Sequence, residues 1–576
     1  MERRVLLAVL LSFVVLYGYQ LLFPPPPEPK PAATGQPGAT NPSAGGAQQP
    51  TPALPAEAVS GQVPPATAAN TADVNARDIV VENAAIRAVF TTRGAALKSW
   101  RLKKYRDAGG EPLELVATHA PPATPLPLTL TTDDPAVTNT LESAVFIPSA
   151  DALSIDSGTR TLQFDLKDGS EIEARKIFTF TADRPYSIGV TADLKRAGQA
   201  LPITVAWGPA IGSGIVQKSR TYNPAPQPVF YRDGKVSRLG VDKIPAQPVQ
   251  EGTFGFAGVD DHYFLAALVA PKQQPLRVTY QSLTVAVAGV PEGAHYVSWS
   301  ARFPSPPRDE TYFFGPKDID NLIAVNHDLS KAIDFGRFDW LVVPLLRSLK
   351  WINGYVGNYG WSLIILTVLI NMVMFPLRHK SVVSMRKMQE VQPEVKAIQD
   401  RYAKLKMSDP ARSKMNVELM NLYRERGVNP ASGCVPMLLT LPVLFAFYAM
   451  LSVAIELRGA PFIGWIHDLS AHDPLFITPV LMGVTMMIQQ RMTPSTADPV
   501  QQKMMMVMPV VMTTMFLWAA SGLVIYWTVS NIWGIGQQMI TNRLIGPAPQ
   551  RTVRPPAERR VKRVGGGRTD QAKGNR

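Results

Sequence analysis

The chain has 576 residues, of which 46% are hydrophobic and 18% charged, with a formal net charge of +13. This length exceeds one domain at about 100–200 residues each. A single cysteine, Cys434, excludes intrachain disulfides. The sequence also lacks a Gly-x-x-x-x-Gly-Lys-Ser/Thr motif, which argues against a machine driven by nucleotide hydrolysis.

Residues 1–23 are predicted to form a transmembrane anchor. A charged start precedes the apolar run Val5–Phe23, which is close to the roughly 20 residues that a helix needs to span a bilayer. A cleavable signal peptide begins in the same way, but no small-x-small cleavage site precedes Pro24. Arg3 and Arg4 place the N-terminus in the cytoplasm by the positive-inside rule.

Residues 24–77 are predicted to be a disordered tether. Four prolines are followed by a stretch dominated by Pro, Ala, Gly, Thr and Gln, which cannot bury a core. A plain spacer is favoured over a partner-binding segment.

From 78 to 334 the hydrophobic period changes to two. Leu162, Phe164 and Leu166 alternate with polar residues before a turn at Lys167–Ser170, which is typical of a β-hairpin. About 250 residues of this kind predict a large antiparallel β-sandwich on the outer side of the membrane.

Four side chains in this region could suggest catalysis: Asp260, Asp261, His262 and His295. Neighbours on a strand point to opposite faces, so these residues do not build one site by themselves. We expect an ancillary docking or scaffold domain. A sugar- or peptide-binding cleft is the alternative.

Residues 335–352 are predicted to form an amphipathic helix in the outer interface of the membrane. Apolar residues recur there at three- and four-residue steps: Phe335, Phe338, Leu341, Leu345 and Leu349. Pro344 would bend the helix or remove one backbone hydrogen bond. The alternative is a packing helix of the soluble domain.

Residues 378–432 predict a basic helical hairpin on the cytoplasmic side. An apolar stripe with coiled-coil spacing forms its first helix, and Asp409 and Pro410 begin the second, which ends near Gly427. Its docking candidates are Arg386, Lys387, Lys396, Arg401 and Lys404. Charge alone leaves three interpretations open: lipid headgroups, ribosomal RNA or a targeting factor, and a merely solvated face.

Five apolar segments are expected to span the membrane: Tyr359–Leu377, Gly433–Ile455, Leu475–Ile488, Met504–Ala520 and Leu523–Ile540. Span two then belongs to residues 353–377 and spans three to six to residues 433–545. With the anchor, six spans place the hairpin and the basic tail 546–576 on the cytoplasmic side.

Polar residues interrupt these spans, and each would be costly facing lipid. They are Thr367, Asn371, Thr513, Thr514, Thr528, Ser530, Asn531 and Gln537. They could hold the bundle together through hydrogen bonds between helices. They could also line a wet cavity that opens inward.

Several motifs together resemble the YidC-type membrane-protein insertases, in the form found in Gram-negative bacteria. They are Asn371–Leu377, Gln392–Glu394, Asn429–Pro430, Gly433–Cys434, Trp465–Leu469, Ser521–Trp527 and Ser530–Asn531. The family has relatives in mitochondria and chloroplasts. The resemblance implies a five-span bundle plus an anchor span, with a periplasmic antiparallel β-sandwich, in the bacterial inner membrane.

The resemblance also implies a passive insertase and chaperone that acts alone or with the Sec translocon. Its hydrophilic groove, open to the cytoplasm, would receive the polar end of a substrate helix. The groove residues expected here are Thr367, Asn371, Tyr526, Trp527, Thr528 and Ser530. The helix would then slide into lipid along spans three and five, where Met437, Met450, Met508, Met512 and Met515 are the candidates. Core filling stays open for each methionine, and ordinary packing for Tyr526 and Trp527.

Asn371 departs from the family pattern, because many bacterial members carry an arginine at this position. A weaker dependence on negative charge in the substrate is therefore expected. The expected partners are nascent membrane proteins, Sec components, lipid, and a ribosome or targeting factor. No enzymatic activity, cofactor, metal or DNA partner is expected. The rival classes are a small-solute transporter or channel and an anchored periplasmic sugar-modifying enzyme.

Overall fold

The structure is a computed structural model. It describes residues 75–545 except 108, 123, 168–170, 215–224, 271–274, 304, 403–410, 429–434 and 493–498. The expected anchor, nearly all of the tether and the basic tail therefore lie outside the described residues, as do Lys404, Asp409, Pro410 and Cys434. For Met437 only the backbone is described.

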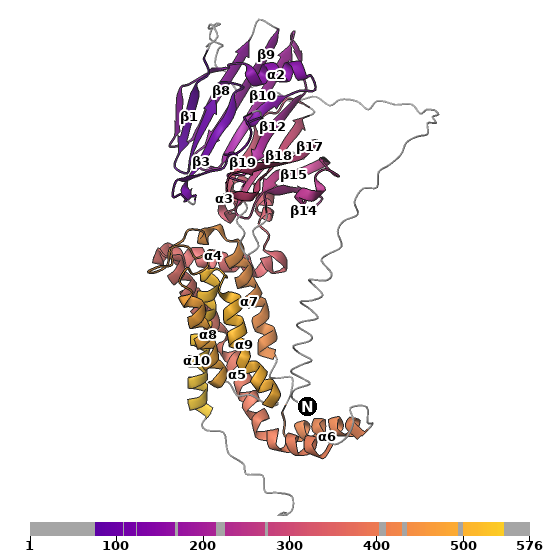
Figure 1. Cartoon of the computed structure of the whole chain (residues 1–576), viewed down its shortest axis with the longest axis vertical. Helices are drawn as coiled ribbons and strands as arrows, with labels where there is room; N and C mark the ends of the chain where they lie inside the picture. Colours follow the sequence, from indigo (N-terminus) through magenta and orange to yellow (C-terminus); the bar gives the residue numbers. More distant parts are fainter. Residues whose placement is uncertain are drawn as a thin grey trace, which may run out of the picture. The chain divides into compact units, whose positions relative to one another are not determined.

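The predicted β-rich region forms two sheets (Figure 1). The five-stranded sheet has the order β4 (Pro112–Glu114), β3 (Ala96–Arg106), β2 (Ile86–Thr91), β1 (Asp78–Asn83) and β7 (Ala152–Ile155). The larger sheet runs through β5 (Pro127–Thr131), β12 (Ile203–Ala210), β18 (Val290–Phe303), β17 (Pro275–Val287), β15 (Val249–Asp260), β16 (Phe264–Val269), β19 (Glu310–Pro316), β10 (Ser187–Arg196), β9 (Ile172–Thr181), β8 (Thr159–Lys167) and β6 (Ile147–Pro148). Three short strands join it from the side: β11 (Gln199–Ala200), β13 (Gln227–Arg232) and β14 (Lys235–Arg238). Neighbours pair antiparallel throughout, except that β1 and β7 are parallel.

Alternating burial explains why these segments are strands. The predicted hairpin is β8–β9, in register with Leu162 opposite Phe178, and its apolar side chains are buried. Phe90 of β2 lies 4.8 Å from Phe178, measured between ring centroids, so the two sheets share one aromatic core. The large antiparallel β-sandwich expected from the sequence is confirmed.

Lys176 of β9 ties the sheets together by polar contacts inside this core. Its side chain is 1% exposed. Its ammonium donates to the carbonyl oxygens of Gly94 at 2.8 Å, Ala95 at 3.0 Å and Leu128 at 2.9 Å. Burial lowers the pKa of Lys176 from 10.5 to about 7.

Small helices complete this part of the chain. They are α2 (Pro135–Ser143), η1 (Val241–Lys243), α3 (Ile319–Val325), η2 (His327–Ala332) and η3 (Gly336–Phe338). Asp134 caps α2 and Asp318 caps α3, each by accepting hydrogen bonds from backbone N–H groups of the first turn.

The expected interfacial helix is α4, which spans Asp339–Val356 rather than residues 335–352. Gly357 ends it in the left-handed conformation with φ of 70°, where its N–H donates to the carbonyl of Asn353. Trp340, Trp351 and Tyr355 are exposed on α4, while Leu345 and Leu349 are buried. The helix is therefore amphipathic, as the spacing predicts.

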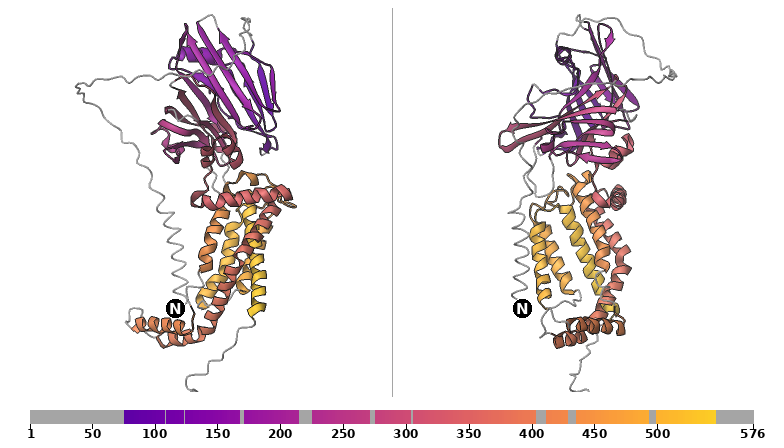
Figure 2. Two further views of the ribbon diagram at one scale, coloured as in Figure 1. Left: turned by 180° about the vertical axis from the view of Figure 1, so that it is seen from behind. Right: turned by 90° about the vertical axis from the view of Figure 1, so that its right-hand side faces the viewer.

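Each of the five apolar segments contains a helix. The helices are α5 (Tyr359–Tyr402), α7 (Val435–Val453), α8 (Ile477–Met492), α9 (Pro499–Phe516) and α10 (Ser521–Ile545), with the short η5 (Ile455–Leu457) after α7. Figure 2 shows these helices running alongside one another, with α4 lying across one end. By length and hydropathy, one described helix, α5, could cross a membrane, and Leu441–Val453 and Met505–Phe516 are shorter apolar helices.

The predicted basic hairpin and the predicted second span share one helix. α5 runs without a break through residue 378, where the sequence placed a boundary, and α6 (Ala411–Glu425) packs beside its C-terminal part. Val391, Val395 and Val428 form a small buried cluster between them. Arg401 pairs with Glu418 at 2.8 Å. Arg426 pairs with Glu394 at 2.7 Å, and this order of the pairs shows an antiparallel hairpin.

Candidate functional site

Asn371 is the centre of a polar contact between α5 and α10. Its side chain is 4% exposed. Its Nδ2 donates to the carbonyl oxygen of Thr367 at 2.8 Å and to Oγ of Ser530 at 3.5 Å. Thr367 is fully buried and donates to the carbonyl of Leu363 one turn earlier. Two of the predicted site residues, Asn371 and Ser530, are therefore in direct contact.

Arg378 brings a positive charge to this contact. Its Nη1 donates to Oδ1 of Asn371 at 2.8 Å. Asn371 and Arg378 are seven residues apart, which places them within about 20° on one face of the helix. By its position in the sequence, Arg378 is only the start of the predicted basic hairpin. The seven-residue spacing is the signal that could have linked it to the site.

Two further contacts join α5 and α10 toward their C-terminal ends. Nδ1 of His379 lies 3.3 Å from Oγ1 of Thr541, and Nη2 of Arg386 donates to Oδ1 of Asn542 at 2.6 Å. Together with the contacts above, they form a line of polar groups between the two helices. We call this line the α5–α10 seam, defined by Asn371, Arg378, His379, Ser530 and Thr541.

The other predicted groove residues face different neighbours. Tyr526 stacks on Phe447 of α7 with ring centroids 4.3 Å apart, and its hydroxyl interacts with Ser530 and Arg378 of the seam. Trp527 contacts Phe516 of α9 edge-on at 5.0 Å. Thr528 donates within its own helix to the carbonyl of Val524. Consecutive residues on a helix point about 100° apart, so Tyr526, Trp527 and Thr528 do not share one face.

A second polar contact, between α8 and α10, was not among the predicted site residues. Nδ2 of Asn531 donates to Oγ1 of Thr485 at 3.3 Å and to the carbonyl of Met482 at 3.4 Å. Both Asn531 and Thr485 are buried. Their hydrogen bonds are of the kind that holds helices of a membrane bundle together.

The candidate methionines differ in exposure. Met508 is 47% and Met515 58% exposed on α9, and Met512 is half-buried. Met450 of α7 is fully buried, so it fills the core rather than an open surface. Met505 and Met506 are additional exposed methionines near the start of α9.

The docking candidates on α5 also differ in exposure and in contacts. Lys387 and Lys396 are exposed. Arg401 is exposed but pairs with Glu418 of α6. Arg386 is half-buried and contacts Asn542 of α10, which makes it part of the helix packing.

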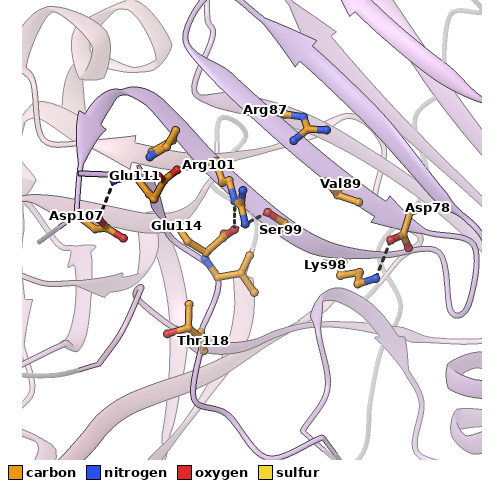
Figure 3. Close-up of a pocket in the computed structure, with 13 residues that line it drawn as sticks. Asp78, Arg87, Val89, Lys98, Ser99, Arg101, Asp107, Glu111, Glu114 and Thr118 are labelled. Atoms are coloured by element: carbon orange, nitrogen blue, oxygen red, sulfur yellow. Dashed lines mark hydrogen bonds and ion pairs between the residues drawn. The ribbon is translucent and has the colours of Figure 1, made fainter. Parts of the chain in front are cut away.

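The β-sandwich carries an open depression of about 670 Å³ over its five-stranded sheet (Figure 3). Charged side chains line it, and several pair with one another. Lys98 contacts Asp78 at 2.7 Å, and Arg101 contacts Glu114 at 3.4 Å. Ser99 also donates to Glu114. These side chains of the lining therefore bond to one another.

The four residues considered for catalysis have structural contacts. Asp260 is buried and pairs with Arg238 at 3.0 Å and Lys317 at 3.2 Å. Asp261 accepts from backbone N–H groups in the turn after β15. Nε2 of His262 lies 2.6 Å from the carbonyl oxygen of Ser452.

His295, the fourth of these residues, lies elsewhere on β18. Its Nδ1 is 3.2 Å from Oγ1 of Thr284 on the neighbouring strand β17. The four residues therefore do not meet in one site.

Lys350 of α4 forms ion pairs with three carboxylates. Its Nζ lies 3.0 Å from Asp318, 2.5 Å from Asp320 and 3.3 Å from Glu456. Burial alone would lower the pKa of Lys350, but the three carboxylates raise it above its ordinary value. Burial raises the pKa of Glu456, against the attraction of Lys350. Lys350 thereby connects α3, α4 and η5.

Comparison with known proteins identifies the family. Residues 78–348 match the YidC periplasmic domain, and residues 351–548 match the 60Kd inner membrane protein family. A membrane protein insertase YidC of Geobacter metallireducens is 37% identical over 559 residues, covering 95% of this chain and 99% of the relative. The chain belongs to the YidC family of membrane protein insertases. The YidC relative from Geobacter sulfurreducens is 39% identical over 564 residues, covering 95% of this chain and 99% of its own.

A crystal structure of an active YidC insertase covers 80% of this chain and 91% of its own, at 18% identity and a TM-score of 0.33. YidC proteins are inner-membrane proteins with a periplasmic domain. Membership in the YidC family confirms the resemblance seen in the sequence and the expectation that the chain is not an enzyme. It gives no support to the transporter alternative.

Proposed function

We propose that this protein inserts newly made membrane proteins into the bacterial inner membrane and assists their folding. We further propose that the α5–α10 seam receives the polar part of the substrate. The observation that carries this proposal is the buried Asn371 with Arg378 bonded to it at 2.8 Å. Polar and charged groups inside membrane spans are costly and are characteristic of functional sites.

The orientation we propose has both termini in the cytoplasm and the β-sandwich in the periplasm. Arg378 and the basic residues after it follow the apolar part of α5, and Arg543 lies in the last turn of α10. Cytoplasmic flanks of spanning helices carry an excess of Lys and Arg. The seam would then lie toward the cytoplasmic side, where substrates arrive.

The energy for insertion would come from the substrate itself. Burying its apolar helix in lipid yields about 25 cal/mol per Å². The seam lowers the barrier for the short polar stretch, because Asn371, Ser530 and Arg378 replace part of its hydration. A polar site part-way across shortens the hydrocarbon path and can thin the bilayer locally.

Arg378 changes the expectation for substrate charge. With Asn371 in place of the arginine common in the family, the sequence predicts a weaker dependence on acidic residues in the substrate than in arginine-bearing relatives. Arg378 brings a guanidinium group to Asn371 from two helical turns away. We therefore propose that acidic substrate segments are favoured, with the charge delivered by Arg378.

Exposed methionines of α9 are the proposed path into lipid. Met505, Met506, Met508 and Met515 are each 42% to 58% exposed. Unbranched, polarisable side chains of this kind adapt to many partner sequences. Met450 is left out of this path because it is fully buried.

Partners beyond the substrate are proposed from exposed charge and from the family. Lys387 and Lys396 are exposed on the proposed cytoplasmic part of α5. Their charge suits ribosomal RNA, a targeting factor or anionic lipid headgroups. Cooperation with the Sec translocon is proposed from the family resemblance alone.

Site-specific photocrosslinking to a stalled nascent membrane protein tests the proposed path. Probes replace Asn371 and Met508, and the control probe replaces Val373, which is 79% exposed on the face of α5 opposite Asn371. Crosslinks from Asn371 and Met508, with none from Val373, are the expected result. Crosslinks from Val373 alone would show that the substrate takes another route.

A further inference from the structure

Three buried polar atoms without partners lie on one stripe of α10. They are Nε1 of Trp533 and both Nε2 and Oε1 of Gln537. Among the described residues of α5 and α7–α10, no other buried side-chain nitrogen or oxygen lacks a hydrogen-bond partner. Gln537 is only 5% exposed. A buried carboxamide without partners costs stability, so its presence calls for a ligand or water.

The stripe faces the α5–α10 seam. Gln537 follows Ser530 by seven residues and precedes Thr541 by four, so the three lie on one face of α10. Ser530 contacts Asn371, and Thr541 contacts His379. Gln537 therefore lies between two contacts of the seam along α10. On α5, the residues between the same two contacts include Arg378.

The spacing of the two side chains fits an extended peptide. Trp533 and Gln537 are four residues apart, a rise of about 6 Å along a helix. An extended chain repeats its same-side backbone groups every two residues, or about 6.7 Å. Within one extended residue, N–H and C=O point to the same side, so one carboxamide can accept from the N–H and donate to the C=O. The indole N–H of Trp533 can donate to the next carbonyl on that side.

We propose that Gln537 and Trp533 bind the main chain of the substrate's polar segment while that segment is extended. A helical segment would not need this site, because its backbone groups bond within the helix. The recognition would be independent of sequence, since every residue except proline offers the same N–H and C=O groups. Arg378, by contrast, would recognise acidic side chains. This inference rests on the proposed function and deepens it.

Insertion by the full-length protein in proteoliposomes tests the inference. The substrates carry one apolar helix behind a tail that is acidic, or neutral and rich in Ser and Asn. A third substrate has the neutral tail with alternate residues replaced by α-hydroxy acids, which turn peptide N–H groups into ester oxygens. Gln537→Leu should slow both peptide tails by the same factor, about tenfold, and Trp533→Phe by about threefold.

The ester tail gives a readout specific to main-chain recognition. The wild-type protein should insert it about tenfold more slowly than the matching peptide tail. Gln537→Leu should insert the two at equal rates, because the lost N–H groups no longer have a partner. If Gln537→Leu also inserts the ester tail more slowly than the peptide tail, the proposal is overturned.

Gln538→Leu is the matched control. Gln538 is equally buried, but its Nε2 donates to Oδ1 of Asn542 at 3.0 Å. Its replacement should leave insertion unchanged. An equal loss in Gln538→Leu would overturn the proposal, as would a loss in Gln537→Leu confined to the acidic tail.

Thermal unfolding separates a binding role from a structural one. Removing partnerless polar atoms should leave the unfolding midpoint of Gln537→Leu equal to or above that of the wild type. A fall in midpoint that parallels the loss of insertion would assign Gln537 to helix packing and overturn the proposal. Full insertion by Gln537→Leu would mean that its amide holds only water. If the wild-type protein inserts no substrate, the proposed function itself fails.

Discussion

Nη1 of Arg378 donates a 2.8 Å hydrogen bond to Oδ1 of Asn371, two turns earlier on α5. The carboxamide of Asn371 is thereby polarised on one side by a cation and bonded on the other to Thr367 and Ser530. A position that has an uncharged side chain in the sequence thus lies within hydrogen-bonding distance of a positive charge.

Arg378→Gln should slow insertion of substrates with acidic tails by about tenfold, the factor that corresponds to losing one charge-assisted hydrogen bond of about 1.5 kcal/mol. Neutral tails should be affected little, because they gain nothing from the charge. Insertion rates into proteoliposomes, measured for both tails, provide the check.

Arg424→Gln is the control for this change, since Arg424 is exposed on α6 and distant in sequence from the seam. Adding Asn371→Arg to Arg378→Gln should restore the preference for acidic tails. Equal slowing of acidic and neutral tails would contradict a charge-specific role for Arg378.

Lys350→Met should destabilise the protein by about 3 kcal/mol, the scale for removing one partner from a buried ion pair. The substitution leaves Glu456, whose side chain is 6% exposed, without its cation. Denaturant unfolding in detergent measures the change. Lys331→Met is the control, because Lys331 and Asp328 are both about 40% exposed and such pairs contribute about 0–1 kcal/mol. Similar losses in the two variants would refute the special role of Lys350.

Lys176 should make the stability of the β-sandwich rise with pH. Its folded pKa of about 7 lies below the unfolded value of 10.5. Between these values the unfolded chain binds a proton that the folded chain lacks. The free energy of unfolding therefore rises with pH in this window, by up to about 1.36 kcal/mol per pH unit. Below pH 7, the contribution of Lys176 no longer changes with pH.

Lys176→Met removes this titration and leaves three carbonyl oxygens without a donor, so it should destabilise the fold at every pH. Hydrogen exchange of β9 in the full-length protein measures both effects. From pH 7.5 to pH 9.5, the stability difference in favour of the wild type should grow by about 2 kcal/mol. A constant difference over this range would show that Lys176 keeps an ordinary pKa.

Gly360→Ala should destabilise the start of α5. A Cβ at Gly360 would overlap Cδ2 of Phe462, in the loop before α8, and would lie 2.8 Å from its Cβ. Overpacking of this kind costs about 1–3 kcal/mol. Gly354→Ala on α4 is the control, with no atom within 4 Å of the added carbon. It should stabilise its helix by about 0.5–1 kcal/mol. Thermal unfolding of both variants measures these changes. An unchanged unfolding midpoint in Gly360→Ala would contradict the prediction.

Periodicity in the sequence determined the β-sandwich and the positions of the apolar helices. Alternation at Leu162, Phe164 and Leu166 predicts β8, and apolar runs predict α5 and α7–α10, because burial follows the period of each local structure. The motifs from Asn371 to Asn531 also indicated the family. These properties depend on near neighbours in the chain.

Contacts between helices were decided only by the tertiary structure. Arg378 belongs to the basic hairpin when composition alone is considered, and the family resemblance assigns Tyr526, Trp527 and Thr528 to one groove. In the folded chain, Arg378 reaches Asn371, while Trp527 faces α9. Which face of a helix meets which neighbour depends on how α5, α7, α9 and α10 pack. Local sequence does not encode that packing, and so the seam and the partnerless amide of Gln537 emerged only from the fold.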